Sequence, residues 1–254
     1  MLEDYSKYSE LNRVPVIDVP ITGTNMADCI NFLAEHIDEL HGEYICVSNA
    51  HTSVLAHDDP SYWDCQAESV MSVPDGKPLS VVGRKSFESM DRVTGPDLMR
   101  EIFEISSQYG WSHYFYGNEQ KNLDALRESL NRDFPGLKIV GMEPSVFRPL
   151  SDNEKYELSN RIANSGANFA WIALGAPRQE VLMHELKGGA TAVDDRCWRS
   201  VQCPRWRGAR GADMDAKPES RVAIQTNSRA KTAFQTIPRN QYEIPLLPVY
   251  KSQT

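Results

Sequence analysis

Two polar residues, Asp75 and Asn49, stand directly after apolar runs, where a folded chain commonly places reactive groups. Asp75 follows the run 70–73 in the sequence Val-Pro-Asp-Gly, and its carboxylate is a candidate general base. The alternative for Asp75 is a plain Asp-Gly turn. Asn49 ends the run that starts at 44, and its amide either orients a polar substrate or caps the following helix.

The segment 175–180, Gly-Ala-Pro-Arg-Gln-Glu, joins a predicted strand to a predicted helix. Small residues there allow main-chain N–H groups to approach a phosphate, and the helix dipole favours its negative charge. Many turns between a strand and a helix have this composition. Gly175, Pro177 and Gln179 are therefore candidate substrate-binding residues.

Three further candidates for substrate binding are Arg84, Arg92 and Gly117. The two arginines lie in the stretch after Asp75 and are long enough to reach a diphosphate, although single arginines are commonly solvated surface residues. Gly117 ends a predicted strand.

Alternating strands and helices must position these residues. Apolar runs typical of buried strands alternate at least six times with segments of helical periodicity. The expected strands are 14–22, 44–47, 70–73, 113–117, 138–142 and 169–175, and the expected helices are 25–40, the stretch after 49, 60–68, one that opens at 95, 119–133, 152–165 and one from 177 to about 186. This order predicts an α/β fold: an open, mostly parallel, Rossmann-like sheet with helices on both faces. Ligands bind beyond the carboxyl ends of such strands, where Asp75 and Asn49 are expected.

Composition narrows the class of protein. The 254 residues include 35 acidic and 27 basic ones, for a net charge of -8, which argues against a general nucleic-acid binder. No apolar run reaches the ~18 residues of a membrane span, and the N-terminal segment lacks the apolar stretch of a signal peptide. The five cysteines form no Cys-x-x-Cys pair, so we expect reduced thiols in a cytoplasmic protein.

Six blocks of sequence occur in a specific order. They are VSNAHTSVLAHDDPSY (47–62), VMSVPDGKPLSVVGR (70–84), DRVTGPDLM (91–99), YFYGNEQ (114–120), FPGLKIVG (134–141) and WIALGAPRQE (171–180). In order and in spacing they resemble the WecG/TagA/CpsF family of bacterial glycosyltransferases. The resemblance covers about three quarters of the chain, from residue 1 to about 187, which we take as the glycosyltransferase core.

The resemblance implies roles for individual residues. Asp75 corresponds to the family's proposed catalytic base, and Gln179 corresponds to the glutamine of its P-[KR]-Q-E block. The family's sugar-contacting T-x-N pair falls on Val47 and Asn49, so the threonine contact is absent here.

The resemblance also implies a reaction and a location. The reaction is inverting, metal-independent transfer from a UDP-sugar to a polyprenyl-diphosphate-linked sugar, in the synthesis of cell-surface polysaccharide or teichoic-acid linkage units. Such an enzyme is cytoplasmic and peripheral at the inner face of the membrane. We expect no cofactor and no metal: the histidines lack ligand spacing, and the D-x-D sequence at 213–215 lies in an anomalous tail.

The tail, residues 188–254, departs from the preceding pattern. It is rich in Arg, lacks helical or strand periodicity, and by composition predicts disorder. Back-translation shifted by one base forces Gly at Trp198-Arg199, Gly at Trp206-Arg207 and Trp at Met214-Asp215, where the family has its G-V-G, H-A-G and A-P-x-W sequences. We interpret the tail as the same gene read out of frame from a point between about Lys187 and Asp194. Resequencing the locus tests this interpretation.

Two other functions remain open from the sequence. A catalytically inactive remnant would bind a nucleotide at most, and a product without its last strand and helix would expose a sheet edge and apolar helix faces. A Rossmann-type dehydrogenase is disfavoured, because no G-x-G-x-x-G follows the first strand.

Overall fold

The computed structural model describes residues 8, 11–187 and 192–194. The elements in the described residues are β1 (Arg13–Val16), β2 (Val19–Thr22), α1 (Met26–His36), the 3-10 helix η1 (Ile37–Glu39), β3 (Tyr44–Ser48), α2 (Ala50–Asp58), α3 (Pro60–Ala67), β4 (Met71–Pro74), α4 (Lys77–Gly83), α5 (Gly95–Tyr109), β5 (Ser112–Gly117), α6 (Gln120–Asp133), β6 (Lys138–Glu143), α7 (Asp152–Asn164), β7 (Phe169–Ala173), α8 (Arg178–Glu185) and β8 (Ala192–Asp194).

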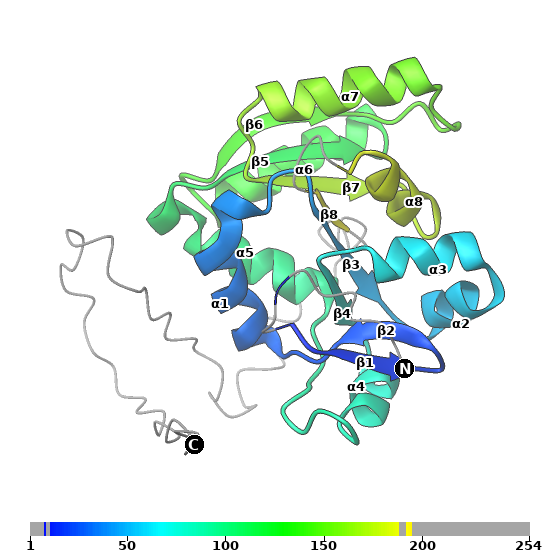
Figure 1. The fold of residues 1–254 in the computed structure, drawn as a ribbon. Helices are drawn as coiled ribbons and strands as arrows, with labels where there is room; N and C mark the ends of the chain where they lie inside the picture. Colours follow the sequence, from blue (N-terminus) through cyan, green and yellow to red (C-terminus); the bar gives the residue numbers. More distant parts are fainter. Residues whose placement is uncertain (1–7, 9–10, 188–191, 195–254) are drawn as a thin grey trace, which may run out of the picture. The chain divides into compact units, whose positions relative to one another are not determined.

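Among the described residues, the main sheet has six strands in the order β4-β3-β8-β7-β5-β6, and every pairing between them is parallel. Helices cover both faces (Figure 1). The predicted open, parallel α/β architecture is therefore confirmed. Because all strands run the same way, the residues that follow them gather at one edge of the sheet.

Two apolar clusters attach the helices to the sheet. On one face α1, α5 and α6 pack against β3, β4, β5 and β7, with Phe115, Phe169 and Trp171 fully buried among them. On the other face α7 and α8 pack against side chains of the same central strands, such as Tyr44 and Ile172. Both faces of the sheet are thus buried, as expected of parallel strands.

The segment 14–22, predicted as one strand, is instead a hairpin. β1 and β2 pair antiparallel, with Pro15 opposite Pro20, and form a separate two-stranded sheet. The chain reverses at Ile17, which has a φ of 67°, and Asp18. The apolar run concealed this turn because no Gly or Asn marks it.

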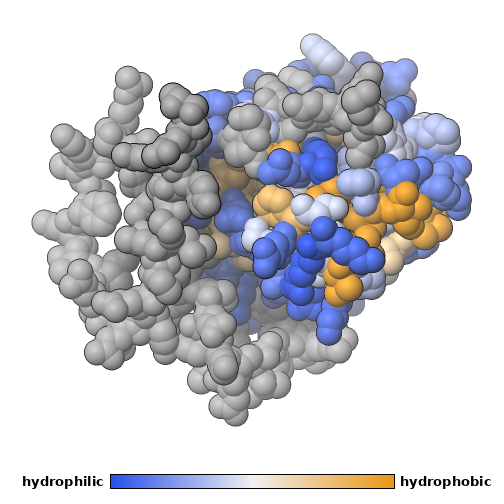
Figure 2. Space-filling model, turned by 60° about the horizontal axis from the view of Figure 1, so that its bottom comes forward, coloured by the Kyte–Doolittle hydropathy of each residue, from blue (hydrophilic) through white to orange (hydrophobic). Residues whose placement is uncertain are grey.

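Helix α4 was not predicted. It packs with the hairpin, α2 and α3 around a third apolar cluster that includes Ile21, Tyr62 and Leu79. Its outer side exposes Val81 and Val82. Figure 2 turns the bottom of Figure 1 toward the viewer, the side on which α4 lies, and shows hydrophobic residues among hydrophilic ones there.

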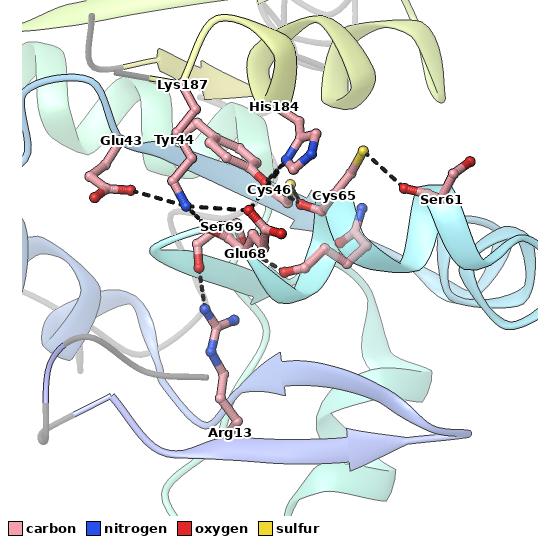
Figure 3. Close-up of polar contacts among 11 residues, drawn as sticks. Arg13, Glu43, Tyr44, Cys46, Ser61, Cys65, Glu68, Ser69, His184 and Lys187 are labelled. Carbon is pink, nitrogen blue, oxygen red and sulfur yellow. Dashed lines mark hydrogen bonds and ion pairs between the residues drawn. The ribbon is translucent and has the colours of Figure 1, made fainter. Parts of the chain in front are cut away.

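Polar contacts at the amino ends of β3 and β4 hold the hairpin and α8 to the sheet (Figure 3). The Arg13 guanidinium donates to the carbonyl oxygens of Ser69 and Val70, just before β4. Its burial lowers the pKa of Arg13 to about 10. The contact with α8 runs through Tyr44 of β3. Its hydroxyl donates to the Cys65 carbonyl at 2.8 Å and lies 3.0 Å from Nδ1 of His184 on α8.

The sequence predicted no element after α8, yet Ala192–Asp194 form β8, which fills the place between β3 and β7. The gap that a missing last strand would leave is therefore occupied in the structure. Apart from 192–194, the residues of the tail lie outside those described. This holds for the predicted disorder, for the D-x-D sequence at 213–215 and for the reading-frame hypothesis. The boundary at about 187 stays a prediction.

Candidate functional site

Asp75 and Asn49 lie next to each other at the carboxyl ends of β4 and β3. The register places Ser48 beside Pro74, so the next residue on each strand is Asn49 or Asp75. The main-chain N–H of Asp75 donates to the carbonyl of Ser48 at 2.6 Å, which ties the two exits together. Both side chains are half-buried. A carboxylate and an amide are thus held side by side at the edge where ligands bind in such sheets.

Asn49 caps helix α2, as one of its two predicted roles required. Its Oδ1 accepts the N–H of Thr52 at 3.1 Å, while its own main-chain N–H donates to Oγ1 of Thr52 at 2.9 Å. This reciprocal capping box fixes the side-chain rotamer. The cap uses only Oδ1, so Nδ2 keeps donor capacity for a substrate oxygen. Capping and sugar orientation are compatible.

A cavity of about 440 Å³ opens at the carboxyl ends of β5 and β7. Its walls come from the ends of these strands, the loop that leads to α7, and the first turns of α8. The lining residues are Tyr116, Asn118, Ser145, Phe147, Arg148, Pro149, Leu150, Lys155, Ala173, Leu174, Gly175, Pro177, Arg178, Gln179, Val181, Leu182 and Glu185. Three predicted substrate-binding residues, Gly175, Pro177 and Gln179, belong to this wall.

Gln179 shapes the 175–178 turn from within. Its side chain is fully buried, and its Oε1 accepts the main-chain N–H of Gly175 at 2.7 Å. Gly175 has a φ of 81°, a left-handed conformation that favours glycine. The peptide bond between Ala176 and Pro177 is cis. Through its hydrogen bond to the N–H of Gly175, Gln179 fixes the backbone that faces the cavity.

Gly117 brings two strands together at the floor of this region. It ends β5 at a φ of 133°, and a Cβ added to it would lie 2.4 Å from the carbonyl oxygen of Ala173 on β7. No side chain fits that space. The buried Gly117 is not among the cavity-lining residues, so its position is explained by the approach of the strands.

Three basic side chains line the cavity and differ in their partners. Arg148 pairs with Glu154 at 2.7 Å, and this pairing raises the pKa of Arg148. Lys155 pairs with Glu185 at 3.0 Å, which raises the pKa of Lys155. Nη2 of Arg178 donates to the Leu174 carbonyl at 2.8 Å. The guanidinium and ammonium groups of these side chains can offer donors to an anion.

The predicted arginines near Asp75 differ in their surroundings. Arg84 donates to the Met90 carbonyl at 2.7 Å and pairs with the carboxylate of Asp91, so its guanidinium fastens the loop after α4. Arg92 is exposed just after Asp91. Neither residue lines the cavity. Their contact with a diphosphate stays a prediction.

The candidates fall into two groups at one edge of the sheet. Asp75 and Asn49 follow β4 and β3, whereas Gly175 and Gln179 follow β7. Strand β8 lies between β3 and β7 in the sheet. Neighbouring strands lie about 4.8 Å apart, so the ends of β4 and β7 are about 14 Å from each other. An extended ligand can contact both groups at once.

The described part of the chain contains no group of three or more His, Cys, Asp or Glu side chains placed to hold a metal ion. In the same residues no helix is both long enough and apolar enough to cross a membrane.

Comparison with known proteins identifies the family. A family model described as "Glycosyl transferase WecG/TagA/CpsF family" matches residues 14–193. The chain belongs to this family. The match begins in the β1–β2 hairpin and ends in β8, so all the predicted site residues of this WecG/TagA/CpsF member lie inside it.

Two curated relatives carry the same name, N-acetylglucosaminyldiphosphoundecaprenol N-acetyl-beta-D-mannosaminyltransferase. The protein from Bacillus subtilis (strain 168) is 22% identical over 172 residues, which cover 67% of this chain and 65% of that protein. The protein from Bacillus spizizenii (strain ATCC 23059 / NRRL B-14472 / W23) is 24% identical over 177 residues, which cover 68% and 66%. The chain spans slightly less than two thirds of the length of these relatives.

Sequence reasoning missed part of the cavity wall of this WecG/TagA/CpsF protein. Tyr116 lies inside the predicted strand 113–117, but no pattern in the sequence marks it as a site residue. Phe147 and Arg148 come from the loop between β6 and α7, and Lys155 comes from the first turn of α7. The loop has no periodicity, and only the capping box of Ser151 and Glu154 marked where it ends at α7.

Proposed function

We propose that this chain is a glycosyltransferase that moves a hexose or an N-acetylhexosamine-type sugar from a UDP-sugar to a polyprenyl-diphosphate-linked acceptor. Family membership and the names of the two relatives support this reaction class. The observation that carries the proposal is the half-buried carboxylate of Asp75, held beside Asn49 at the same sheet edge as the cavity.

Asp75 acts as the general base in this proposal. Its carboxylate takes the proton from the acceptor hydroxyl as that oxygen attacks the anomeric carbon of the donor sugar. The bond between this carbon and the diphosphate oxygen breaks on the opposite side, so the configuration inverts and UDP leaves. Nδ2 of Asn49 donates to a sugar oxygen and orients the ring.

The cavity beside β7 takes the nucleotide diphosphate. The 175–178 turn, held by Gln179, presents main-chain N–H groups at the start of α8. The helix dipole and Arg178 stabilise the negative charge of the leaving UDP without a metal ion. The sugar extends from there toward Asp75, across the exit of β8.

The acceptor places the reaction at a membrane surface. A polyprenyl chain stays in the bilayer, so the diphosphate-linked sugar is presented at the cytoplasmic face. The enzyme is then a peripheral protein that meets its acceptor there.

An assay of UDP release by the purified 254-residue protein tests the proposal. UDP-N-acetylmannosamine and other UDP-sugars are supplied with and without N-acetylglucosaminyl-diphosphoundecaprenol. We expect release that depends on the acceptor. Nucleotide binding without acceptor-dependent release, for every donor tried, would instead favour the inactive remnant.

A further inference from the structure

A buried cluster of three polar side chains lies under Asn49 and Asp75. It consists of Ser48 at the end of β3, Ser72 in β4 and Gln66 near the end of α3. All three side chains are fully buried. Polar groups buried in a core destabilise it unless they bond to each other, so a complete cluster at this place calls for a reason.

The hydrogen bonds of the cluster converge on one atom, Oε1 of Gln66. The hydroxyl of Ser48 donates to it, and the hydroxyl of Ser72 lies 3.0 Å from it. The two hydroxyl oxygens are themselves 2.6 Å apart. On the other side of the amide, Nε2 of Gln66 donates to the Tyr62 hydroxyl at 3.3 Å, which sets the orientation of the amide. One amide oxygen therefore bridges two neighbouring strands.

The bridge lies directly beneath the exits of these strands. Ser72 pairs with Cys46 in the sheet, and Ser48 is two residues further along β3 on the same face. Asn49 follows Ser48 in the chain, and the carbonyl of Ser48 accepts the N–H of Asp75. A shift of β3 against β4 would thus move the amide of Asn49 relative to the carboxylate of Asp75.

We infer that Gln66 is a positioning residue that sets the spacing of Asn49 and Asp75 by clamping Ser48 to Ser72. The inference rests on the proposed function, since it assigns Gln66 to the same site. Gln66 touches no substrate. It acts through the two strands, and the effect falls on the rate of transfer more than on donor binding, because the nucleotide cavity lies at β5 and β7.

Two variants separate positioning from simple stability. Gln66→Met removes the amide, so that of this cluster each serine hydroxyl keeps only the other as a partner, which destabilises the core. The triple variant Ser48→Ala/Gln66→Met/Ser72→Ala removes the amide together with both serine hydroxyls, and such apolar replacement restores much of the stability. We expect kcat to fall about tenfold or more in both variants, since small displacements of reacting groups carry large rate penalties. KM for the donor should change less than kcat.

Ser106→Ala is the matched control. Ser106 is a buried serine of α5 that bonds to the Ile102 carbonyl and to His113 of β5, a strand that β7 and β8 separate from β3. The Ser106→Ala variant should be less stable than the wild type and should keep the wild-type kcat. A triple variant that folds and retains the wild-type kcat would overturn the inference.

Hydrogen exchange gives a readout that needs no activity. Exchange at the Asp75 amide should accelerate in the folded triple variant, while amides of β5 keep their protection. If the wild-type protein transfers no sugar, the proposed function fails, and the exchange data still decide whether Gln66 holds the two strands. Unchanged exchange at Asp75 would refute the clamp.

Discussion

The main-chain N–H of Asp75 donates to the carbonyl of Ser48 at 2.6 Å, one residue before Asn49. This bond extends the ladder of β3 and β4 past its last strand pair. The side chains of Asn49 and Asp75 therefore start from backbone positions that the sheet fixes, and neither depends on a mobile loop for its place.

Replacement of Asp75 tests the assignment of the base. Asp75→Asn keeps the shape of the side chain and removes its ability to accept a proton, so kcat for transfer should fall by about 100-fold or more. The melting temperature should stay close to that of the wild type. Asp64→Asn, an exposed position on α3, serves as a control and should keep full activity. Near-normal turnover by Asp75→Asn would remove Asp75 from this role.

Replacement of Arg178 tests the location of the nucleotide. Arg178→Ala removes a charged donor from the cavity wall, and the Kd for UDP should rise about tenfold, as expected for one charge-assisted hydrogen bond. Isothermal titration calorimetry measures this directly. Arg127→Ala, at an exposed position on α6, should bind UDP as the wild type does. Equal affinity in the two variants would place the nucleotide elsewhere.

A methyl group at Gly117 should separate β5 from β7. In Gly117→Ala the new Cβ meets the Ala173 carbonyl, so the variant pays for overpacking by about 1–3 kcal/mol in addition to the strain of a positive φ. Gly110→Ala, where φ is also positive but nothing lies within 4 Å, should lose only about 1–2 kcal/mol from that strain. Urea unfolding of both variants measures the difference. Equal losses would mean that the strands adjust without cost.

Stability at low pH should depend on His113. This imidazole is buried between Ser106 and Trp171, and its burial lowers the pKa of His113 to about 3. An unfolded histidine has a pKa of about 6.5, so between these values the unfolded chain binds the proton and the folded chain does not. The free energy of unfolding therefore falls as the pH falls through this window.

The comparison variant for this effect is His113→Gln, which keeps a donor and an acceptor but does not titrate in this range. Urea unfolding at pH 7 and at pH 4 should show a smaller loss in His113→Gln than in the wild type. The two proteins share their carboxylates, so these contribute equally. Identical losses would contradict a buried neutral His113.

The sequence predicted the positions of Asp75 and Asn49 because local signals mark them. A Pro-Asp-Gly turn ends β4, and a capping residue begins α2. It could not predict the cavity wall at Phe147 and Lys155, because only the folding of the β6–α7 connection brings these residues beside β7. Gln66 was missed for a related reason: one glutamine in a helix gives no sign that two serines from different strands will meet it.

Other errors have equally local causes. The turn at Ile17 and Asp18 contains no Gly or Asn, so the sequence predicted one strand where β1 and β2 form a hairpin. β8 has three residues, too few to show a period. Arg84 is not among these errors: it pairs with Asp91 in the fold, and its contact with a diphosphate stays a prediction.

The central position of β8 constrains the order in which the sheet can assemble. β3 with β4, and β5 with β6 and β7, are two sets of strands that can form early during synthesis, since each is nearly contiguous in sequence. The strand that joins them pairs Ala192 with both Tyr44 and Ala170. Closing so long a loop is slow. We therefore expect the two halves of the sheet, which carry Asp75 and the cavity beside β7, to join into one edge only late in folding.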